Sequence, residues 1–101
     1  MKIIWAEPTN NDLKNIKEFI KKGSDYYAEI FTLKLINAAD ILENFPEAGR
    51  IVPEYNKSYI REIIFKGYRI IYKIESEYIY VLTVIHGSRD LKRHINENDI
   101  I

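Results

Sequence analysis

The alternation of apolar and polar positions is clearest between residues 59 and 90, where it predicts three consecutive β-strands. The runs Ile60–Phe65, Tyr68–Ile74 and Tyr78–His86 are short and rich in isoleucine, valine and tyrosine. These residue types suit the pleated surface of a sheet. Lys66-Gly67 separates the first two runs, and residues 75–77 separate the second from the third. We therefore expect an antiparallel β-meander in the C-terminal half of the chain.

The turn at Lys66-Gly67 decides which side chains share a face of this meander. A two-residue turn pairs the first two strands as follows: Phe65 with Tyr68, Ile63 with Ile70, and Arg61 with Tyr72. Residues directly opposite lie on the same face, and this face is the larger and more aromatic, so we expect it to pack against helices. The other face then carries Ile60, Glu62, Ile64, Arg69, Ile71 and Lys73. A three-residue turn would instead move Arg69 to the face of Arg61.

Apolar residues at helical spacing predict two helices in the N-terminal half. Lys2–Trp5 is expected to be an edge or joining strand, and residues 9–12 resemble a capping box that would begin the first helix at Thr9. Gly23 would end it, and Ser24 or Asp25 would cap a second helix of about five turns. Two amphipathic helices joined by a few residues predict an antiparallel hairpin that buries its apolar side against the sheet.

The order of elements predicts an α+β fold for residues 1–101 as a single domain. An N-terminal strand precedes the antiparallel helical hairpin, which packs on the C-terminal antiparallel β-meander (β-α-α-β-β-β). Pro46 stops the second helix, and Asp90 is expected to cap a short turn of helix through Ile95.

Composition excludes several classes of function and site. Fifteen basic residues balance fifteen acidic ones, which argues against a broad nucleic-acid surface and leaves room only for a local basic patch. The chain has no cysteine, which excludes a disulfide framework and a thiolate metal site and fits a reducing compartment. No apolar run is long enough for a signal peptide or a membrane span, so we expect a cytoplasmic protein without a membrane partner.

Three segments in order resemble the RelE/ParE family of toxins from type II toxin–antitoxin systems. They are FPEAGRIVPE at residues 45–54, REIIFKGYRIIYKI at residues 61–74 and VLTVIHGSRDL at residues 81–91. The resemblance covers nearly the whole chain and implies a small growth-arresting toxin that a cognate antitoxin neutralises. It implies no metal and no organic cofactor. Members similar to RelE cut mRNA in the ribosomal A site, and members similar to ParE inhibit DNA gyrase.

The resemblance to RelE implies a set of candidate catalytic residues. Arg69 matches the arginine after Gly-Tyr in the second hairpin strand, and Arg89 matches a basic position after the last strand. His86 is a candidate acid or base near neutral pH. Glu62 is a candidate base, or alternatively the partner of Arg69 or Lys73 in a cross-strand ion pair. Metal-free RNA cleavage needs such a base, an acid and cations for the phosphate.

Departures from RelE leave three functions open. Ile60 and Glu62 stand where RelE-like enzymes carry lysines, and His94 is the one candidate near their tail position. These differences and the neutral charge favour inhibition of a protein target such as DNA gyrase. The alternatives are a ribosome-dependent mRNA interferase and a non-toxic module that only binds its antitoxin.

The outer face of the sheet predicts a partner surface. It would hold an apolar patch made of Ile60, Ile64, Ile71, Ile79 and Val81, and patches of this kind usually mark interfaces. We expect an antitoxin segment, or a second copy of the chain in a homodimer, to cover part of it. Arg61 is expected to be structural or to face the antitoxin.

Overall fold

A five-stranded sheet in the order β1-β5-β4-β3-β2 forms the centre of the molecule. The computed structural model describes residues 1–100, the side chains of Glu97 and Ile100 excepted. The strands are β1 (Lys2–Trp5), β2 (Arg50–Ile51), β3 (Ile60–Phe65), β4 (Tyr68–Ile74) and β5 (Tyr78–His86). β1 lies parallel beside β5, and the other neighbouring strands are antiparallel. The expected α+β architecture is confirmed.

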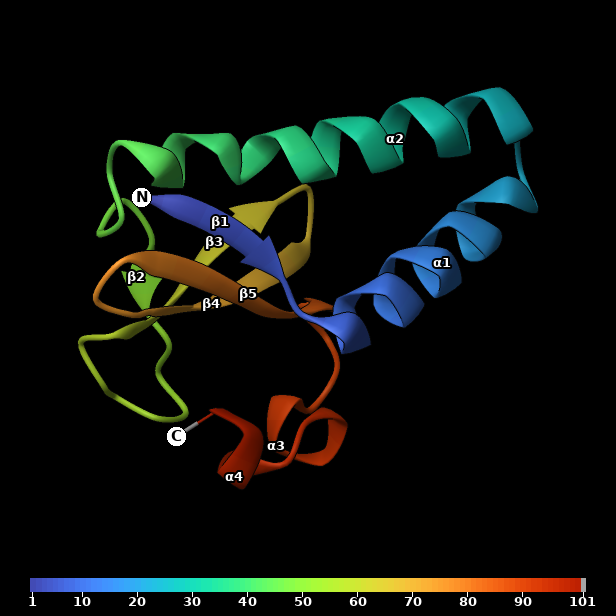
Figure 1. Cartoon of the computed structure of the whole chain (residues 1–101). Coiled ribbons are helices and arrows are strands. Elements are labelled where there is room, and N and C mark those ends of the chain that lie inside the picture. The colour runs from blue at the N-terminus through green and yellow to red at the C-terminus, as the bar shows by residue number, and fades with distance from the viewer. Residues whose placement is uncertain (101) are drawn as a thin grey trace.

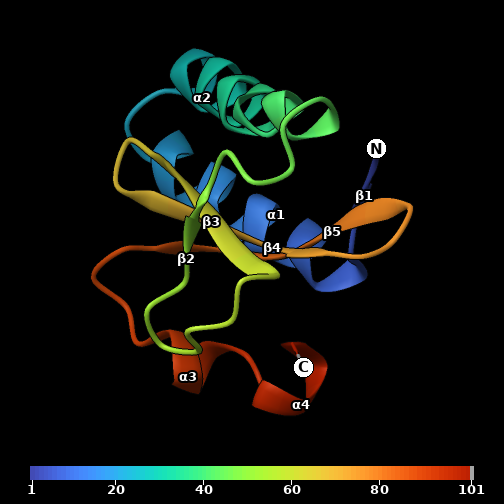
Figure 2. The same ribbon diagram turned by 90° about the vertical axis from the view of Figure 1, so that its left-hand side faces the viewer.

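Helices lie on both sides of this sheet (Figure 1). They are α1 (Glu7–Lys21), α2 (Asp25–Ala38), the 3-10 helix η1 (Asp40–Glu43), α3 (Leu91–His94) and α4 (Glu97–Ile100). The splayed α1–α2 hairpin packs against the sheet from one side, and the short C-terminal helices lie on the other (Figures 1 and 2). Within residues 1–100, no helix combines the length and apolar character needed to cross a bilayer.

Both long helices differ from their expected limits. α1 begins at Glu7 rather than at Thr9, with Pro8 in its first turn, where the missing N–H of proline is tolerated. Thr9 is buried, and its hydroxyl donates to the Ala6 carbonyl instead of capping the helix. Ser24 caps α2 as expected by accepting from the Tyr27 N–H at 3.1 Å. α2 itself has only 14 residues, because the tighter η1 takes over and carries Leu42 into the core.

The β3–β4 register is the expected one, with Phe65 opposite Tyr68 and Arg61 opposite Tyr72. Lys66 and Gly67 both have positive φ, 46° and 87°, which is the conformation of a two-residue turn that matches the twist of a hairpin. The face containing Ile70 and Tyr72 packs on the helices, as expected.

The prediction of an exposed apolar patch on the outer face is wrong. Ile60 and Ile71 are fully buried there, because the chain covers this face itself with Val52 and Tyr55 of the β2–β3 connection and Leu91 of α3. Ile79 and Val81 are also fully buried, but on the helix side, since they lie opposite Ile74 and Tyr72. Of the five residues, only Ile64 remains half-exposed.

Candidate functional site

Arg69 lies in a buried group of charges on the outer face of the sheet. Its two terminal nitrogens donate to Glu54, each at 2.7 Å, and its Nε donates to Glu62 at 2.5 Å. Glu62 also accepts from the Arg50 Nε at 2.7 Å. We call Arg50, Glu54, Glu62 and Arg69 the Arg69 cluster. It contains two cations and two anions, so its charges balance.

The β2–β3 connection closes the Arg69 cluster. Val52 and Tyr55 pack in the outer core on either side of Glu54, which holds this carboxylate over the sheet. The hydrogen bonds from Arg69 lower the pKa of Glu54, and Glu54, followed by Glu62, raises the pKa of Arg69. Arg69 is only 8% exposed. A phosphate could reach its guanidinium only by displacing a carboxylate that already forms a bidentate, charge-assisted pair.

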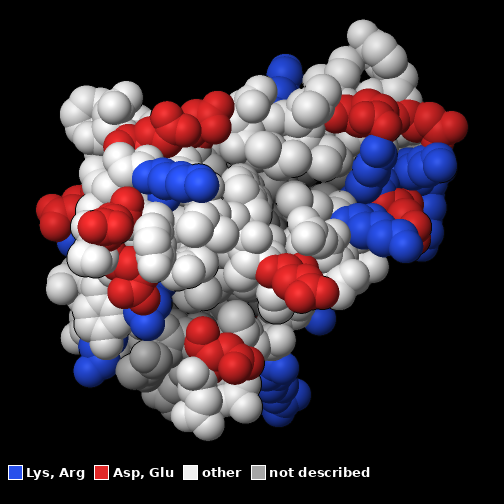
Figure 3. Space-filling view, viewed as in Figure 1, with Lys and Arg blue, Asp and Glu red and all other residues white. Residues whose placement is uncertain are grey.

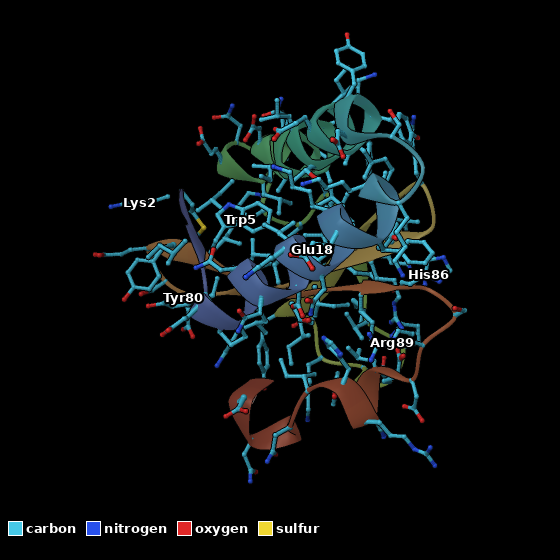
Figure 4. All side chains as sticks on the ribbon, turned by 90° about the vertical axis from the view of Figure 1, so that its right-hand side faces the viewer. Lys2, Trp5, Glu18, Tyr80, His86 and Arg89 are labelled. Carbon is cyan, nitrogen blue, oxygen red and sulfur yellow. The ribbon has the colours of Figure 1, made fainter. Side chains whose placement is uncertain are left out.

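His86 and Arg89 lie elsewhere, at an open pocket between α1 and the C-terminal end of β5 (Figure 4). This β5-end pocket has a volume of about 490 Å³. Its polar and aromatic lining includes Asp12, Asn15, Phe19, His86, Arg89 and His94. Among the described residues, no carboxylate lies within ion-pair distance of the Arg89 guanidinium. This exposed cation is therefore available to a ligand or partner.

The ring of His86 is oriented by its neighbours. Its Nδ1 accepts from the Ser88 N–H at 3.2 Å and lies 2.7 Å from the Ser88 Oγ. Because a backbone N–H can only donate, Nδ1 is the acceptor and the neutral ring carries its proton on Nε2. Tyr68 packs edge-on against the ring, with centroids 5.2 Å apart, and burial raises the pKa of its phenol. In this tautomer His86 offers a hydrogen-bond donor at Nε2.

Asp12 joins three elements at the wall of the β5-end pocket. It accepts from the Thr83 hydroxyl at 2.6 Å and from the Val84 N–H at 3.2 Å. Its second oxygen lies 3.1 Å from His94 Nε2, which connects α1 to α3. Sequence analysis missed this role of Asp12, since it read the residue as part of a helix cap. The signal available in the sequence was the position of Asp12, next to Leu13 and four residues before Ile16, on the apolar side of the helix.

The expected site residues therefore fall into two groups. Arg69 and Glu62 form the Arg69 cluster, and His86 and Arg89 line the β5-end pocket together with His94. Arg61 donates to the carbonyls of Ser58 and Gly49, which fixes the chain around β2. Of the residues expected to bind a partner, Ile60 and Ile71 are inaccessible, and Arg61 and Ile64 keep exposed surface. Within residues 1–100, no three His, Cys, Asp or Glu side chains are grouped to hold a metal.

Comparison with known proteins assigns the family. The family model described as ParE toxin of type II toxin–antitoxin system, parDE, matches residues 3–91. Toxin RelE2 of Caulobacter vibrioides is 27% identical over 88 residues, which cover 86% of this chain and 96% of that protein. A chain from the chromosomal ParDE system of P. aeruginosa has the same fold, with a TM-score of 0.72 at 13% identity over 85% of this chain and 95% of its own length. This protein is a toxin of a type II toxin–antitoxin pair and belongs to the ParE toxin family.

Proposed function

We propose that this toxin arrests growth by binding a protein target, with DNA gyrase as the candidate, and not by cutting RNA. The observation that supports the proposal is the closure of the Arg69 cluster. Metal-free RNA cleavage needs cationic groups around the scissile phosphate, and of the two candidate arginines only Arg89 remains free for that role within the described residues. Both terminal nitrogens of Arg69 instead bind Glu54, and its Nε binds Glu62.

The β5-end pocket is the proposed contact with the target. A general base must present a free lone pair to the proton that it removes. The neutral His86 has its lone pair at Nδ1, where the Ser88 N–H already donates, and presents an N–H at Nε2. Together with the exposed Arg89 guanidinium, this arrangement suits recognition of acceptor groups on a protein surface.

Gyrase inhibition is tested with purified toxin, gyrase, ATP and relaxed plasmid. We expect the native toxin to block supercoiling, and His86→Ala/Arg89→Ala to weaken the block. Lys57→Ala, which changes an exposed residue of the β2–β3 connection, is the matched control. Intact supercoiling at saturating toxin, in a preparation that still arrests growth, would contradict the proposal.

The second candidate, a ribosome-dependent mRNA interferase, is favoured by one observation. The β5-end pocket is lined by both a histidine and an arginine that has no carboxylate partner among the described residues. Primer extension on mRNA from cells that express the toxin without antitoxin separates the two functions. Cuts inside translated codons that disappear in His86→Ala/Arg89→Ala would establish the interferase. If overexpression does not slow growth at all, the chain is an antitoxin-binding module without toxicity.

A further inference from the structure

An apolar hollow lies at the other end of the β4–β5 pair from the β5-end pocket. It has a volume of about 750 Å³, and its apolar wall is formed by Met1, Ile41, Phe45, Pro46, Ala48 and Ile74. We call it the Phe45 hollow. Tyr68 lines the β5-end pocket and Ile74 lines the Phe45 hollow. Ile74 comes six positions after Tyr68 in β4, so the two sites are about 20 Å apart along an extended strand.

Two large apolar side chains that line the Phe45 hollow are exposed, although hydrogen bonds hold the backbone around them. Phe45 is 62% exposed and Ile41 is 50% exposed. The Phe45 N–H donates to the Ile41 carbonyl at 3.0 Å. The buried Tyr72 hydroxyl donates to Pro46 at 2.6 Å and accepts from the Gly49 N–H at 3.0 Å. Two large apolar groups thus lie in water on a preorganised wall, a combination typical of a docking surface.

One carboxylate lines the Phe45 hollow, and two more lie on the neighbouring η1. Glu47 lines the hollow, and Asp40 and Glu43 are exposed on η1, the element that provides Ile41. Figure 3 shows acidic side chains over both ends of α2, including the end near β1, where a basic side chain lies beside them, and basic side chains gathered along α1. The Met1 ammonium also lies at this hollow, where it donates to the Glu43 carbonyl at 2.6 Å. The carboxylates of Asp40, Glu43 and Glu47 outnumber this one positive charge, which gives the rim a local negative potential.

We propose that the Phe45 hollow binds a segment of the cognate antitoxin that carries apolar anchors flanked by lysine or arginine. Apolar anchors would fill the hollow, and basic flanks would pair with Glu43 and Glu47. The location leaves the β5-end pocket, about 20 Å away, free for the target. The inference rests on membership of the toxin family and deepens the proposed function by assigning the antitoxin a site of its own.

Binding of the purified cognate antitoxin to toxin variants, measured by calorimetry, tests the proposal. We expect Ile41→Ala/Phe45→Ala to weaken binding about tenfold or more, as truncation of interface anchors does. The matched control is Leu33→Ala, which removes a side chain that is 57% exposed on α2 outside the hollow. It should bind like the native toxin. Both variants should still arrest growth without antitoxin, since they do not touch the β5-end pocket.

Reversing the charges beside the hollow gives a second test, which leaves the apolar side chains unchanged. Glu43→Lys/Glu47→Lys changes two exposed side chains, so the variant should fold. It should bind the antitoxin more weakly than the native toxin does, and the difference should be larger at low salt than at high salt, because salt screens the charges. Antitoxin affinity within about twofold of the native value in both double variants would overturn the proposal. Loss of growth arrest with full antitoxin affinity would also overturn it, because the hollow would then serve the target. A negative gyrase assay leaves this result unaffected and refutes only the proposed target.

Discussion

At the residue scale, carboxylate partners decide whether an arginine can bind a ligand. Arg69 has two such partners and is closed off, whereas Arg89 is exposed. The sequence predicted that Glu62 could pair with Arg69, because both lie on the same face of adjacent strands. It did not predict Glu54, which lies in an irregular connection without any periodicity. That second carboxylate binds both terminal nitrogens of Arg69 and changes an expected phosphate ligand into a buried structural group.

Arg69→Ala should therefore destabilise the fold rather than only remove a functional group. The substitution leaves the buried Glu62 carboxylate with Arg50 as an ion-pair partner. It also removes the arginine that binds both oxygens of Glu54. We expect a loss of about 3–5 kcal/mol in the free energy of unfolding, measured in urea. Arg50→Ala is the control, because its side chain is 61% exposed and its loss should stay below about 1 kcal/mol. Equal losses in the two variants would show that Arg69 is not the centre of the cluster.

The same cluster predicts a dependence of stability on pH. Arg69 lowers the pKa of Glu54 in the folded state, so the pair contributes stability above the unfolded pKa of about 4.3. The contribution is lost as the pH falls below that value, because the unfolded chain then binds the proton more readily. Urea midpoints measured between pH 6 and about 3 should fall less steeply in Glu54→Gln than in the native toxin. Parallel curves would mean that Glu54 does not titrate against Arg69.

At the element scale, the β3–β4 hairpin was the most predictable part of the chain. A two-residue turn leaves a single register, and the alternating pattern of the strands agrees with it. The cover of the outer face could not be predicted, because Val52, Tyr55 and Leu91 come from connections without a repeat. The start of α1 was misplaced since Thr9 resembles a cap, while Pro8 fits the first turn equally well.

The turn itself gives a prediction about glycine. Gly67 has a φ of 87°, a conformation that alanine adopts only with strain. Gly67→Ala should lower the free energy of unfolding by about 1–2 kcal/mol in thermal melts. Gly23→Ala is the matched control: its added methyl would lie 3.7 Å from the Ile20 carbonyl, an ordinary contact. This control should be neutral or slightly stabilising. A neutral Gly67→Ala would contradict the assigned turn.

At the scale of the whole molecule, the sheet separates two cores, and the C-terminal segment belongs to the second. Leu91 is 1% exposed and packs in the outer cluster with Ile60 and Ile71. If this cluster supports the fold, Leu91→Ala should cost about 2–5 kcal/mol, as for other buried leucines. It should also increase binding of an apolar dye, because the outer face loses its cover.

Leu33→Ala is the control that shows whether the loss of stability in Leu91→Ala comes from the buried position of Leu91 or from the removal of any leucine side chain. The Leu33 side chain is 57% exposed on α2, so its removal should change the free energy of unfolding by less than about 0.5 kcal/mol. If Leu91→Ala behaves in the same way, the outer cluster does not contribute to stability and the C-terminal helices can leave the sheet without unfolding it. The face that the sequence predicted to be a partner surface would then be available in solution. If Leu91→Ala is strongly destabilising, that face is a permanent core, and the partners of this toxin must bind surfaces that remain exposed, such as the Phe45 hollow and the β5-end pocket.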